Sequence, residues 1–537
     1  MNMRNETETA ADYIIVGSGS AGAVVAARLA ENPAINVLLI EAGGSNRRML
    51  VDMPAGTLKL MANATSDWMY HVEADTTRGD IEQVWSGGKM LGGSSSINGM
   101  VYCRGEKRDF DDWVAMGCTG WAANDIWPLF LKSEKFHGPP SQDHGTSGPL
   151  GVAPVRSQHP LTENFVSACD EVGLPRRDDY CDGHEFGSFH IWTTTAGGQR
   201  SNTFSAFVSP LLDRPNLAVV TGVTIDRIEC EDGRAVRVVG SRNGEPYCAA
   251  ARREIVISAG TIGSPAILMR SGIGPAAHLR ELGIDILADL PVGENLQEHA
   301  VLAVSKLVTM PTYNMAPKLS NLPRHVANYL LFRKGPLTSP AVQAMAYART
   351  EAHLADPDVC FSFIPLAMDL SGQPKLHARS GVTIGGQICR PNARGKITLQ
   401  SRDHLAPPKI ALNMLEDAED IRTLTKVGRL AEQIFAAPAF APFVEARNEP
   451  PQPIMSDEGW LDYLRQRVGI GYHPVGTCRM GREGESVLDP QLRVRGIDGL
   501  RVIDASIMPR ITSGNTNAPS MMIGERGAEL ILRSLKV

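Results

Sequence analysis

The sequence predicts a mixed α/β fold built from two lobes that interleave along the chain, and three observations support this. A short apolar run near the N-terminus ends in a glycine-rich turn, as expected for a buried strand that leads into a helix. The same pattern of strand, turn and helix returns near the middle of the chain and again near its end. Residues 301–469 show a different sequence pattern, with short strand patterns and one amphipathic helix. We therefore expect one lobe with helices on a parallel sheet and a second, α+β lobe built on an antiparallel sheet with helices.

The first unit begins with the strand Tyr13–Val16 and continues through a turn into a helix and a second strand, Val37–Ile40. In this turn Gly17 permits a tight bend, Gly19 lets backbone amides approach a pyrophosphate, and Gly22 lets helix and strand pack closely. The arrangement predicts a Rossmann-like dinucleotide-binding unit. Its turn residues are Gly17, Ser18, Gly19, Ser20, Ala21 and Gly22.

An acidic residue, Glu41, follows the second strand, nineteen residues after Gly22. A carboxylate at this position accepts hydrogen bonds from an adenosine ribose hydroxyl. Because it would repel a 2′-phosphate, Glu41 favours NAD or FAD over NADP. The alternative is a plain structural turn, and the surrounding strand, helix and strand argue against it.

Composition and charge limit the classes of function. With 537 residues, 43% of them hydrophobic and 21% charged, the chain can form at least two globular lobes. Its net charge of -6 leaves no basic excess, so we expect no nucleic-acid partner. Its nine cysteines form no C-x-x-C pair and suit a reducing compartment better than secretion.

We expect no targeting segment and no membrane-spanning segment. The first eleven residues are polar, and no apolar run reaches the roughly eighteen residues that would span a bilayer. These features favour a cytoplasmic protein. Peripheral contact with the inner membrane and the oligomeric state stay open.

The second unit consists of the strand Glu254–Ser258, a turn at Ala259 and Gly260, and a helix. We expect this helix to start with Ser264 as its cap and Pro265 at its first position. This would be a second strand, turn and helix near a nucleotide.

The third unit lies near the end of the chain. The strand Leu500–Ile503 runs into Asp504, and Pro519 opens an apolar helix over Ser520–Ser534. A further strand is predicted at Leu217–Val220. The nucleotide-binding lobe therefore takes up the end of the chain as well as its beginning.

The region between these units is predicted to cover the cofactor. It has strand patterns at Val359–Phe363 and Lys396–Gln400 and an amphipathic helix around Asp417–Phe435. We assign residues 12–155, 205–300 and 470–537 to the nucleotide-binding domain. Residues 156–204 and 301–469 form the predicted substrate-binding domain.

Two stretches that lie far from the glycine turn hold the best candidates for catalysis, residues 471–481 and residues 513–519. The first contains His473, and Pro474 biases it away from helical geometry and so stiffens its loop. The second contains Asn517. On sequence alone the histidine could be an ordinary core or surface residue, and the asparagine could be an ordinary helix cap.

Longer motifs resemble a known family. Residues 88–102 read GKMLGGSSSINGMVY and resemble the first signature of the glucose-methanol-choline (GMC) oxidoreductases. Residues 260–274 read GTIGSPAILMRSGIG and resemble the second. With the glycine turn, His473 and Asn517, the resemblance spans residues 12 to 534. It is strongest to bacterial FAD-dependent alcohol and choline dehydrogenases that carry the sequence HPVGTCRMG.

The resemblance implies an FAD enzyme that transfers a hydride from an alcohol carbon to flavin N5. His473 would accept the hydroxyl proton, and Asn517 would position the alkoxide. Neutral histidine suits such a base near pH 7, and an amide donor stabilises the oxygen without competing for the proton. The positive end of the helix that starts at Pro519 would favour negative charge on reduced flavin.

The resemblance also implies which residues bind FAD. The loop at Gly92 and Gly93 would hold the flavin, with Asn98 nearby. Some family members attach FAD through a histidine just before this asparagine; because Ile97 stands there, we predict non-covalent FAD. Trp68 would lie against the isoalloxazine, with a place in the core as the alternative. We predict no metal site. The predicted cofactor-binding set is Gly17, Ser18, Gly19, Ser20, Ala21, Gly22, Glu41, Ala42, Trp68, Met90, Gly92, Gly93, Ser94, Asn98, Gly99, Met100, Val101, Val223, Ala259, Gly260, Asp504, Ala505, Asn515 and Thr516.

The substrate class is predicted from one position. Gln343 falls where the choline-using pattern has a glutamate, and a neutral amide cannot balance a quaternary ammonium. We therefore expect a neutral primary alcohol, which can be aliphatic, aromatic or a polyether. Its pocket would be lined by Met345, Phe361, Phe363 and Met368, although these side chains could also fill the core.

Several alternatives stay open for the activity. We expect electrons to pass to a quinone-like acceptor, and a choline dehydrogenase or an oxygen-using alcohol oxidase is the alternative. A more distant alternative is a flavoprotein resembling the hydroxynitrile lyases of this family, whose flavin does no redox work. A non-catalytic nucleotide-binding scaffold is disfavoured because His473 and Asn517 are both present.

Overall fold

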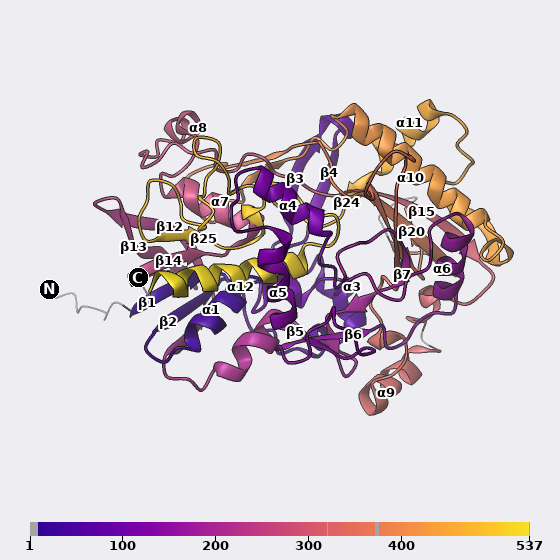
Figure 1. Cartoon of the computed structure of the whole chain (residues 1–537), viewed down its shortest axis with the longest axis horizontal. Helices are drawn as coiled ribbons and strands as arrows, with labels where there is room; N and C mark the ends of the chain where they lie inside the picture. Colours follow the sequence, from indigo (N-terminus) through magenta and orange to yellow (C-terminus); the bar gives the residue numbers. More distant parts are fainter. Residues whose placement is uncertain (1–8, 319, 371–374, 536–537) are drawn as a thin grey trace.

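The computed structural model describes residues 9–318, 320–370 and 375–535. Two lobes lie side by side in Figure 1. The lobe at the left contains β1, β2, β14, α1 and α12, and the lobe at the right contains β15, β20, α6 and α10. Segments from the beginning, the middle and the end of the chain meet in the left lobe, which confirms the expected interleaving.

The left lobe is built on a seven-stranded sheet. Its strands follow the order β11-β2-β1-β14-β13-β12, and β25 pairs with β14. The β11, β2, β1, β14 and β25 strands run parallel, while β12, β13 and β14 form an antiparallel meander. Every residue of β2 is buried, as expected for a parallel strand covered on both faces. The strands are β1 (Thr9–Val16), β2 (Val37–Glu41), β11 (Leu217–Thr221), β12 (Val223–Glu231), β13 (Arg234–Arg242), β14 (Glu245–Ile257) and β25 (Leu500–Val502).

Helices from distant parts of the chain belong to this lobe. They are α1 (Gly22–Ala30), α5 (Ala123–Ser133), α7 (Gly260–Arg270) and α12 (Asn517–Ser534). The α1 and α12 helices pack together, and a buried ion pair joins them where Arg28 Nη2 lies 2.6 Å from Glu525 Oε1. Ser133 of α5 donates to the same carboxylate at 2.9 Å. One fully buried charge therefore ties three helices together.

The right lobe is built on a six-stranded antiparallel sheet of order β16-β17-β20-β15-β23, with β24 beside β15. The α10 helix (Ala418–Ala436) packs on β15 and β20, and its cap Asp417 accepts from the amides of Glu419 and Asp420. The α6 helix (Leu161–Glu171) and α11 (Asp457–Arg467) flank α10. The strands are β15 (Ala300–Val308), β16 (Ala344–Ala348), β17 (Val359–Ile364), β20 (Gly381–Ile388), β23 (Val444–Glu449) and β24 (Gly469–Ile470).

The described chain also contains shorter elements. The helices are α2 (Met49–Asp52), α3 (Thr57–Leu60), α4 (Lys107–Ala115), α8 (Ala276–Glu281) and α9 (Leu322–Phe332). The strands of the small sheets are β3 (Tyr70–Asp75), β4 (Ile81–Trp85), β5 (Glu134–Phe136), β6 (Leu150–Pro154), β8 (Trp192–Thr193), β9 (Thr195–Ala196), β10 (Gln199–Arg200), β18 (Met368–Asp369), β19 (Lys375–Leu376), β21 (Lys396–Thr398) and β22 (Lys409–Ala411). A further strand, β7 (Gly187–His190), lies against β16.

The structure confirms the predicted fold class and corrects several boundaries. The α7 helix begins at Gly260 rather than at Ser264, because a glycine turn and not a serine cap starts it. The α12 helix begins at Asn517, three residues before the predicted Ser520. The strand predicted at Lys396–Gln400 belongs to a two-stranded hairpin outside the large sheet. The domain boundaries remain a prediction, and one of them, at residue 155, cuts the small sheet of β5, β6 and β8.

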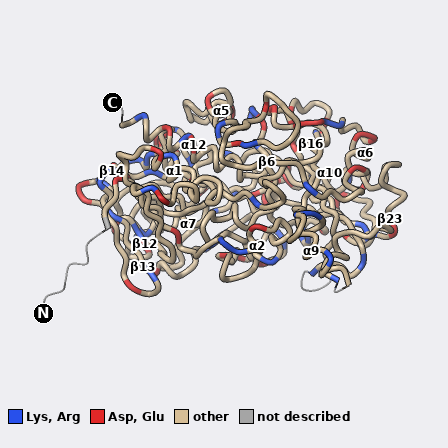
Figure 2. Tube along the Cα trace, turned by 90° about the horizontal axis from the view of Figure 1, so that it is seen from below, with Lys and Arg blue, Asp and Glu red and all other residues tan. Residues whose placement is uncertain are grey.

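Surface and cysteine chemistry agree with the composition. None of the described helices is both long and apolar enough to cross a membrane. All nine cysteines are free thiols. Basic and acidic residues are interspersed along most of the chain in Figure 2.

Candidate active site

The glycine turn between β1 and α1 has the shape of a phosphate-binding turn. A Cβ on Gly17, whose φ is +102°, would lie 2.3 Å from the carbonyl oxygen of Ser258, and one on Gly22 would lie 2.0 Å from that of Gly17. Both positions therefore require glycine for close packing. A Cβ on Gly19 would meet no atom within 4 Å, so this side of the turn is open. The α1 helix begins here without a side-chain cap, which leaves amides to face an anion.

Glu41 lies at the end of β2, where the dinucleotide motif predicts it. Its carboxylate accepts from the amide and hydroxyl of Ser18, at 3.1 and 2.7 Å, and from the amide of Gly43 at 2.8 Å. Burial raises the pKa of Glu41, and these donors oppose the shift. The amide of Gly222 donates to the Gly43 carbonyl at 3.2 Å, which brings the predicted Val223 close to the chain after Glu41 and Ala42.

The loop over residues 88–101 lies directly on the glycine turn. The amide of Gly92 donates to the Ser18 carbonyl at 3.1 Å, and a Cβ on Gly93 would lie 2.7 Å from the Cα of Gly19. Ser94 accepts from the amide of Gly88 at 3.1 Å. This loop and the turn thus form one surface.

The end of this loop is fixed by a buried arginine that sequence reasoning missed. Arg200 Nη1 donates to the side chain and carbonyl of Asn98, at 2.9 and 2.7 Å, and the same Asn98 side chain accepts from the amide of Met100 at 3.0 Å. Gly99 lies between them with open space at its Cβ position, and the backbone of Val101 pairs with Thr193. Burial lowers the pKa of Arg200 to about 9.

Two predicted positions have apolar surroundings. Met90 and Ile97 are buried and form a small cluster with Val51 and Leu60. Ile97 therefore offers no nucleophile for a covalent flavin. Trp68 is partly exposed; its ring stacks on Tyr70 with centroids 5.8 Å apart, and Lys89 Nζ lies 4.4 Å from it.

The second glycine turn is organised by Asp504. Its carboxylate accepts from the amide of Gly260 at 2.9 Å, from the hydroxyl of Ser264 at 2.5 Å and from the amide of Ser506 at 2.8 Å. The Ser264 hydroxyl in turn accepts from the amide of Ala259 at 3.0 Å. Burial raises the pKa of Asp504, and these donors oppose the shift. The predicted residues Ala259, Gly260 and Asp504 therefore form one hydrogen-bonded unit.

A proline inside α7 holds the loop that carries His473. Pro265 has no amide hydrogen, so the carbonyl of Thr261, four residues earlier, loses its helical donor. The buried hydroxyl of Thr477 donates to this carbonyl at 2.6 Å, and Thr261 Oγ1 donates to the Pro474 carbonyl at 2.7 Å. The predicted Ala505 also contacts the loop, because its carbonyl accepts from the amide of Gly476 at 3.4 Å.

His473 lies between two side chains. Its Nδ1 is 2.9 Å from Nδ1 of His299, and its Nε2 is 2.7 Å from Nδ2 of Asn515. Burial lowers the pKa of His473 well below its usual range, and His299 adds to the shift. His473 is therefore neutral at pH 7 and carries one ring proton.

The partners of His299 determine where that proton lies. Nε2 of His299 is 3.1 Å from the Cys389 carbonyl, an acceptor, so this nitrogen carries the hydrogen. Burial lowers the pKa of His299 to about 4, so its ring is neutral and its Nδ1 is an acceptor. His473 Nδ1 is the nearer donor to this nitrogen, at 2.9 Å against 3.3 Å for Nε2 of Gln387, and donation from Nδ1 leaves a lone pair on Nε2 of His473. The Asn515 amide donates to that lone pair.

Asn517 lies at the glycine turn, where it is the first residue of α12 and its Oδ1 accepts from Ser20 at 2.8 Å. That Asn517 positions the alkoxide stays a prediction. Asn515, predicted only to bind the cofactor, takes the place beside His473. Thr516 between them precedes the first turn of α12 without a side-chain cap.

A polar segment before β15 supports the His473 loop and was missed by sequence reasoning. The Glu298 carboxylate accepts from the amides of His473 and His299, at 2.9 and 2.8 Å. Burial raises the pKa of Glu298 to about 8, although these amides favour the ionised form. Gln297 pairs with Val475 through backbone hydrogen bonds. The available signal was the mostly polar stretch from Glu294 to His299, interrupted by Leu296, just before an apolar strand.

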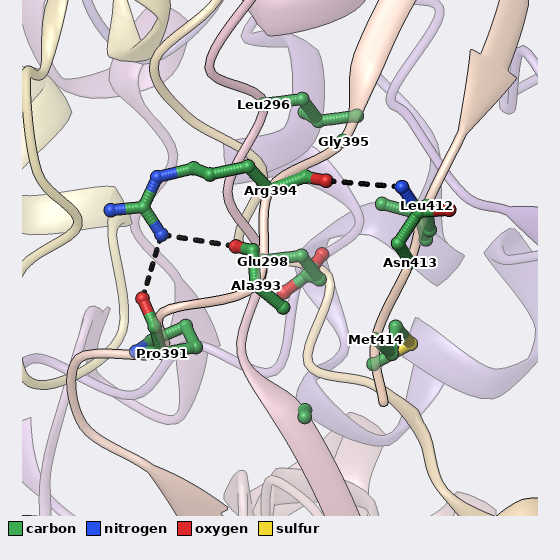
Figure 3. Close-up of a pocket in the computed structure, with 10 residues that line it drawn as sticks. Leu296, Glu298, Pro391, Ala393, Arg394, Gly395, Leu412, Asn413 and Met414 are labelled. Atoms are coloured by element: carbon green, nitrogen blue, oxygen red, sulfur yellow. Dashed lines mark hydrogen bonds between the residues drawn. The ribbon is translucent and has the colours of Figure 1, made fainter. Parts of the chain in front are cut away.

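A small cavity borders this segment. It is lined by Glu298 and Arg394, among others, and holds about 10 Å³, roughly the space of one water. Figure 3 shows Arg394 Nη1 donating to the carbonyls of Pro391 and Ala393, at 2.7 and 3.0 Å, and its own carbonyl accepting from Asn413 at 3.5 Å. The cavity is too small for a substrate.

The structure does not support the predicted substrate pocket. Met345, Phe361 and Phe363 are fully buried core residues. Gln343 is also fully buried; its Oε1 accepts from the amide of His159 and the hydroxyl of Thr162, and its Nε2 donates to Ser339 at 2.6 Å. Because protein groups saturate this amide, its neutrality carries no information about the charge of the substrate. The fourth predicted residue, Met368, is partly exposed.

One cluster in the described part of the chain has metal-ligating side chains, His144, Asp179 and Cys181. Both ring nitrogens of His144 are already bonded, to Glu134 at 2.7 Å and to Asp179 at 2.9 Å. The cluster is therefore a buried hydrogen-bond network.

Comparisons with known proteins agree with this geometry. The N-terminal family profile described as GMC oxidoreductase matches residues 11–301, and its C-terminal counterpart matches residues 391–524. The chain is 38% identical to an oxygen-dependent choline dehydrogenase of Rhizobium johnstonii over 528 residues, which cover 97% of this chain and 95% of that protein. It is equally similar to the corresponding protein of Brucella suis biovar 1 over 526 residues, with the same coverage.

Solved structures show the same fold. Pyridoxine 4-oxidase from Mesorbium loti superimposes with a TM-score of 0.89 at 29% identity, covering 97% of this chain and 99% of that chain. A variant of formate oxidase from Aspergillus oryzae RIB40 superimposes with a TM-score of 0.92 at 28% identity, covering 99% of both chains.

Proposed function

The chain belongs to the GMC oxidoreductase family, and from that premise we propose that it oxidises the CH–OH group of a small alcohol to the carbonyl compound, with FAD as cofactor. One observation carries the proposal. Nε2 of His473, which has a lone pair, lies 2.7 Å from the side-chain amide nitrogen of Asn515.

The cofactor is FAD, and the residues of the first glycine turn suit it. The open side of Gly19 and the uncapped starts of α1 and α12 suit the pyrophosphate, and Glu41 suits the adenosine ribose. Asn202 supplies a further argument: its Nδ2 is buried without a partner, beside Gly92. The FAD pyrophosphate would supply an acceptor for this donor. Ile97 supports non-covalent binding.

In this proposal His473, Asn515 and His299 have different roles in the oxidation of the alcohol. The Nε2 lone pair of His473 accepts the hydroxyl proton as the carbon loses its hydride, and the amide of Asn515 moves from that lone pair to donate to the developing alkoxide. His299 keeps the ring proton of His473 on Nδ1. Bound FAD would supply the two-electron acceptor for the hydride.

For the substrate we propose an alcohol of the choline type. Two observations support this over the neutral primary alcohol predicted from the sequence. The curated relatives at 38% identity are choline dehydrogenases, and Gln343, which spoke against a cation, is saturated by protein groups. Anaerobic titration of the yellow protein with choline and with medium-chain alcohols tests the proposal. Bleaching of the flavin by medium-chain alcohols but not by choline would refute the choline assignment.

Two electron acceptors follow from different arguments. The quinone-like carrier comes from resemblance to the dehydrogenase subgroup, whereas the names of the curated relatives speak of oxygen. We propose the quinone-like carrier. Hydrogen peroxide formed in step with the aldehyde would identify an oxidase, and the absence of any bleaching by alcohols would identify a lyase-like flavoprotein.

Substitutions test the catalytic pair. His473→Ala and Asn515→Ala should each slow flavin reduction by about 10²-fold or more, because each removes a group that acts on the reacting oxygen. Asn517→Ala is the matched control, and it should weaken FAD retention while the remaining holoenzyme is reduced at nearly the original rate. Equal loss of the reduction rate in both asparagine variants would contradict the assignment of Asn515.

A further inference from the structure

One helix of the right lobe is almost uncovered. Among the eleven residues of α9 only Tyr329 is buried. The helix ends with Leu330, Leu331 and Phe332, whose side chains are 52%, 72% and 61% exposed. Figure 1 shows α9 at the lower edge of the molecule. Three adjacent large apolar side chains that are exposed to water indicate a surface that binds another molecule or a membrane.

The neighbouring α2 and α3 helices extend this apolar surface. Figure 2 shows α2 and α9 near each other on the same face. Burial raises the pKa of Asp52 on α2, and the positive charge of Arg333, which follows α9, lowers it. Arg333 and Asp52 are therefore close neighbours. Half of the fourteen large apolar side chains that are exposed in the described residues lie here. These seven form the α2–α9 face: Met49, Leu50, Leu58, Leu322, Leu330, Leu331 and Phe332.

The charge around this face is opposite to that of the whole chain. Residues 44–60 and 322–334 contain six Lys and Arg residues and one acid, whereas the net charge of the protein is -6. Of the six, Arg47, Arg48, Lys59, Arg324 and Lys334 are exposed. Arg156 adds a seventh cation, because its Nε donates to the Arg333 carbonyl at 2.5 Å.

The apolar side chains and the basic residues around them together indicate what binds to this face. Leucine and phenylalanine side chains rimmed by basic residues suit the headgroup region of an anionic bilayer, where apolar groups enter the acyl boundary and cations meet lipid phosphates. A second copy of this chain would oppose one basic rim with another, and the two would repel.

We propose that the α2–α9 face docks the protein on anionic membrane surfaces. The inference does not depend on the alcohol chemistry proposed above. Phe332 and its two leucine neighbours enter the bilayer interface, and the surrounding lysines and arginines bind lipid phosphate groups.

Vesicle flotation of the holoenzyme tests this directly. We expect binding to phosphatidylcholine vesicles that contain phosphatidylglycerol, little binding to phosphatidylcholine alone, and release as salt is raised. Leu331→Asp with Phe332→Asp should lower the partition coefficient at least about tenfold. Arg324→Gln and Lys334→Gln should each lower it about fivefold, as expected for one cation near an anionic surface.

A matched pair elsewhere controls for nonspecific effects. Leu405 and Met455 are 68% and 88% exposed and lie outside this face, so Leu405→Asp with Met455→Asp should bind vesicles like the wild type. Because all four side chains are exposed, the melting temperatures of both double variants should match that of the wild type, as circular dichroism would show.

Four results would overturn the proposal. They are equal binding of the wild type to both kinds of vesicle, unchanged binding of the Leu331→Asp, Phe332→Asp variant, equal loss in the control pair, and a dimer that this variant converts to a monomer in light scattering. The last result would make the face an interface between copies. Turnover of the variant with a soluble dye as electron acceptor should stay unchanged.

Discussion

At the scale of single residues, the pair His299 and His473 leads to the sharpest prediction. His299→Leu removes the acceptor for Nδ1–H of His473, so the ring can place its proton on Nε2 and lose the lone pair that we propose accepts the hydroxyl proton. We expect kcat/KM to fall about a hundredfold or more, as when the partner of a catalytic histidine is lost.

His299→Asn is the conservative variant, because its carbonyl oxygen can accept the same hydrogen. It should recover part of the loss, as measured by stopped-flow reduction of the flavin across a range of pH. If the two variants behave alike, His299 supports the loop only through packing and does not select the tautomer.

The pH dependence of stability follows from the same histidine. Burial lowers the pKa of His299 to about 4, so the folded protein keeps this ring neutral while the unfolded chain protonates it near its usual value of about 6.5. The free energy of unfolding should therefore fall as pH drops from about 6.5 to 4, by about 1.4 kcal/mol per unit. Urea titration of the wild type and of His299→Asn measures the difference; if both lose stability equally over this window, the shift lies elsewhere.

Sequence reasoning identified His473 but not its partners. A histidine in a proline-stiffened loop is visible in the sequence, whereas the neighbour at hydrogen-bond distance depends on where α12 begins. With the helix starting at Asn517, that side chain turns toward Ser20, and Asn515 in the preceding loop reaches the imidazole. His299 lies 174 residues from His473, and no local pattern connects them.

At the scale of elements, the energetic coupling between α7 and the loop that carries His473 can be measured. Thr477→Val removes the hydroxyl that satisfies the Thr261 carbonyl freed by Pro265, so a buried acceptor is left unpaired. We expect a loss of about 1–3 kcal/mol in the free energy of unfolding. A fall in the rate of flavin reduction should accompany it, because the same loop carries His473.

Pro265→Ala supplies the second arm of a double-mutant cycle. With an amide restored at position 265, the helix itself satisfies the Thr261 carbonyl, and Thr477→Val should then cost less. Additive losses in the double variant would show that the two groups do not interact.

The elements themselves were mostly visible in the sequence. The amphipathic period around Asp417–Phe435 marks α10 to within one residue, and Asp417, the first residue of the predicted helix, is its cap. Ser264 and Pro265 misled the prediction of α7, because the pattern of cap and proline also occurs inside a helix whose freed carbonyl is satisfied from another loop. Such compensation is tertiary, and local propensity does not contain it.

At the scale of the whole molecule, FAD should act as part of the fold. The proposed site joins the glycine turn, the loop at residues 88–101 and the start of α12, so the bound cofactor holds three distant segments together. Free FAD at about a thousandfold over its dissociation constant should add about 4 kcal/mol to the free energy of unfolding. Calorimetry of the apoprotein with and without FAD measures this, and Glu41→Ala should show a smaller gain. NADP is the control ligand and should leave the melting temperature unchanged.

The interleaving of the lobes was predicted from three repeated units, because each carries its own strand and turn signal. The uncovered face of α9 was not predicted. Its sequence resembles that of an ordinary amphipathic helix, and only the structure shows that its large apolar side chains are left exposed.

The contact between Ser20 and Asn517 joins residues 497 positions apart. During translation the glycine turn leaves the ribosome long before α12 is made. The FAD site of the nascent polypeptide therefore stays incomplete until α12 has been synthesised. A premature stop codon anywhere upstream of α12 would release a product that contains the fingerprint motif yet lacks the helix that completes it. We expect such fragments to bind no flavin and to be degraded by cellular proteases.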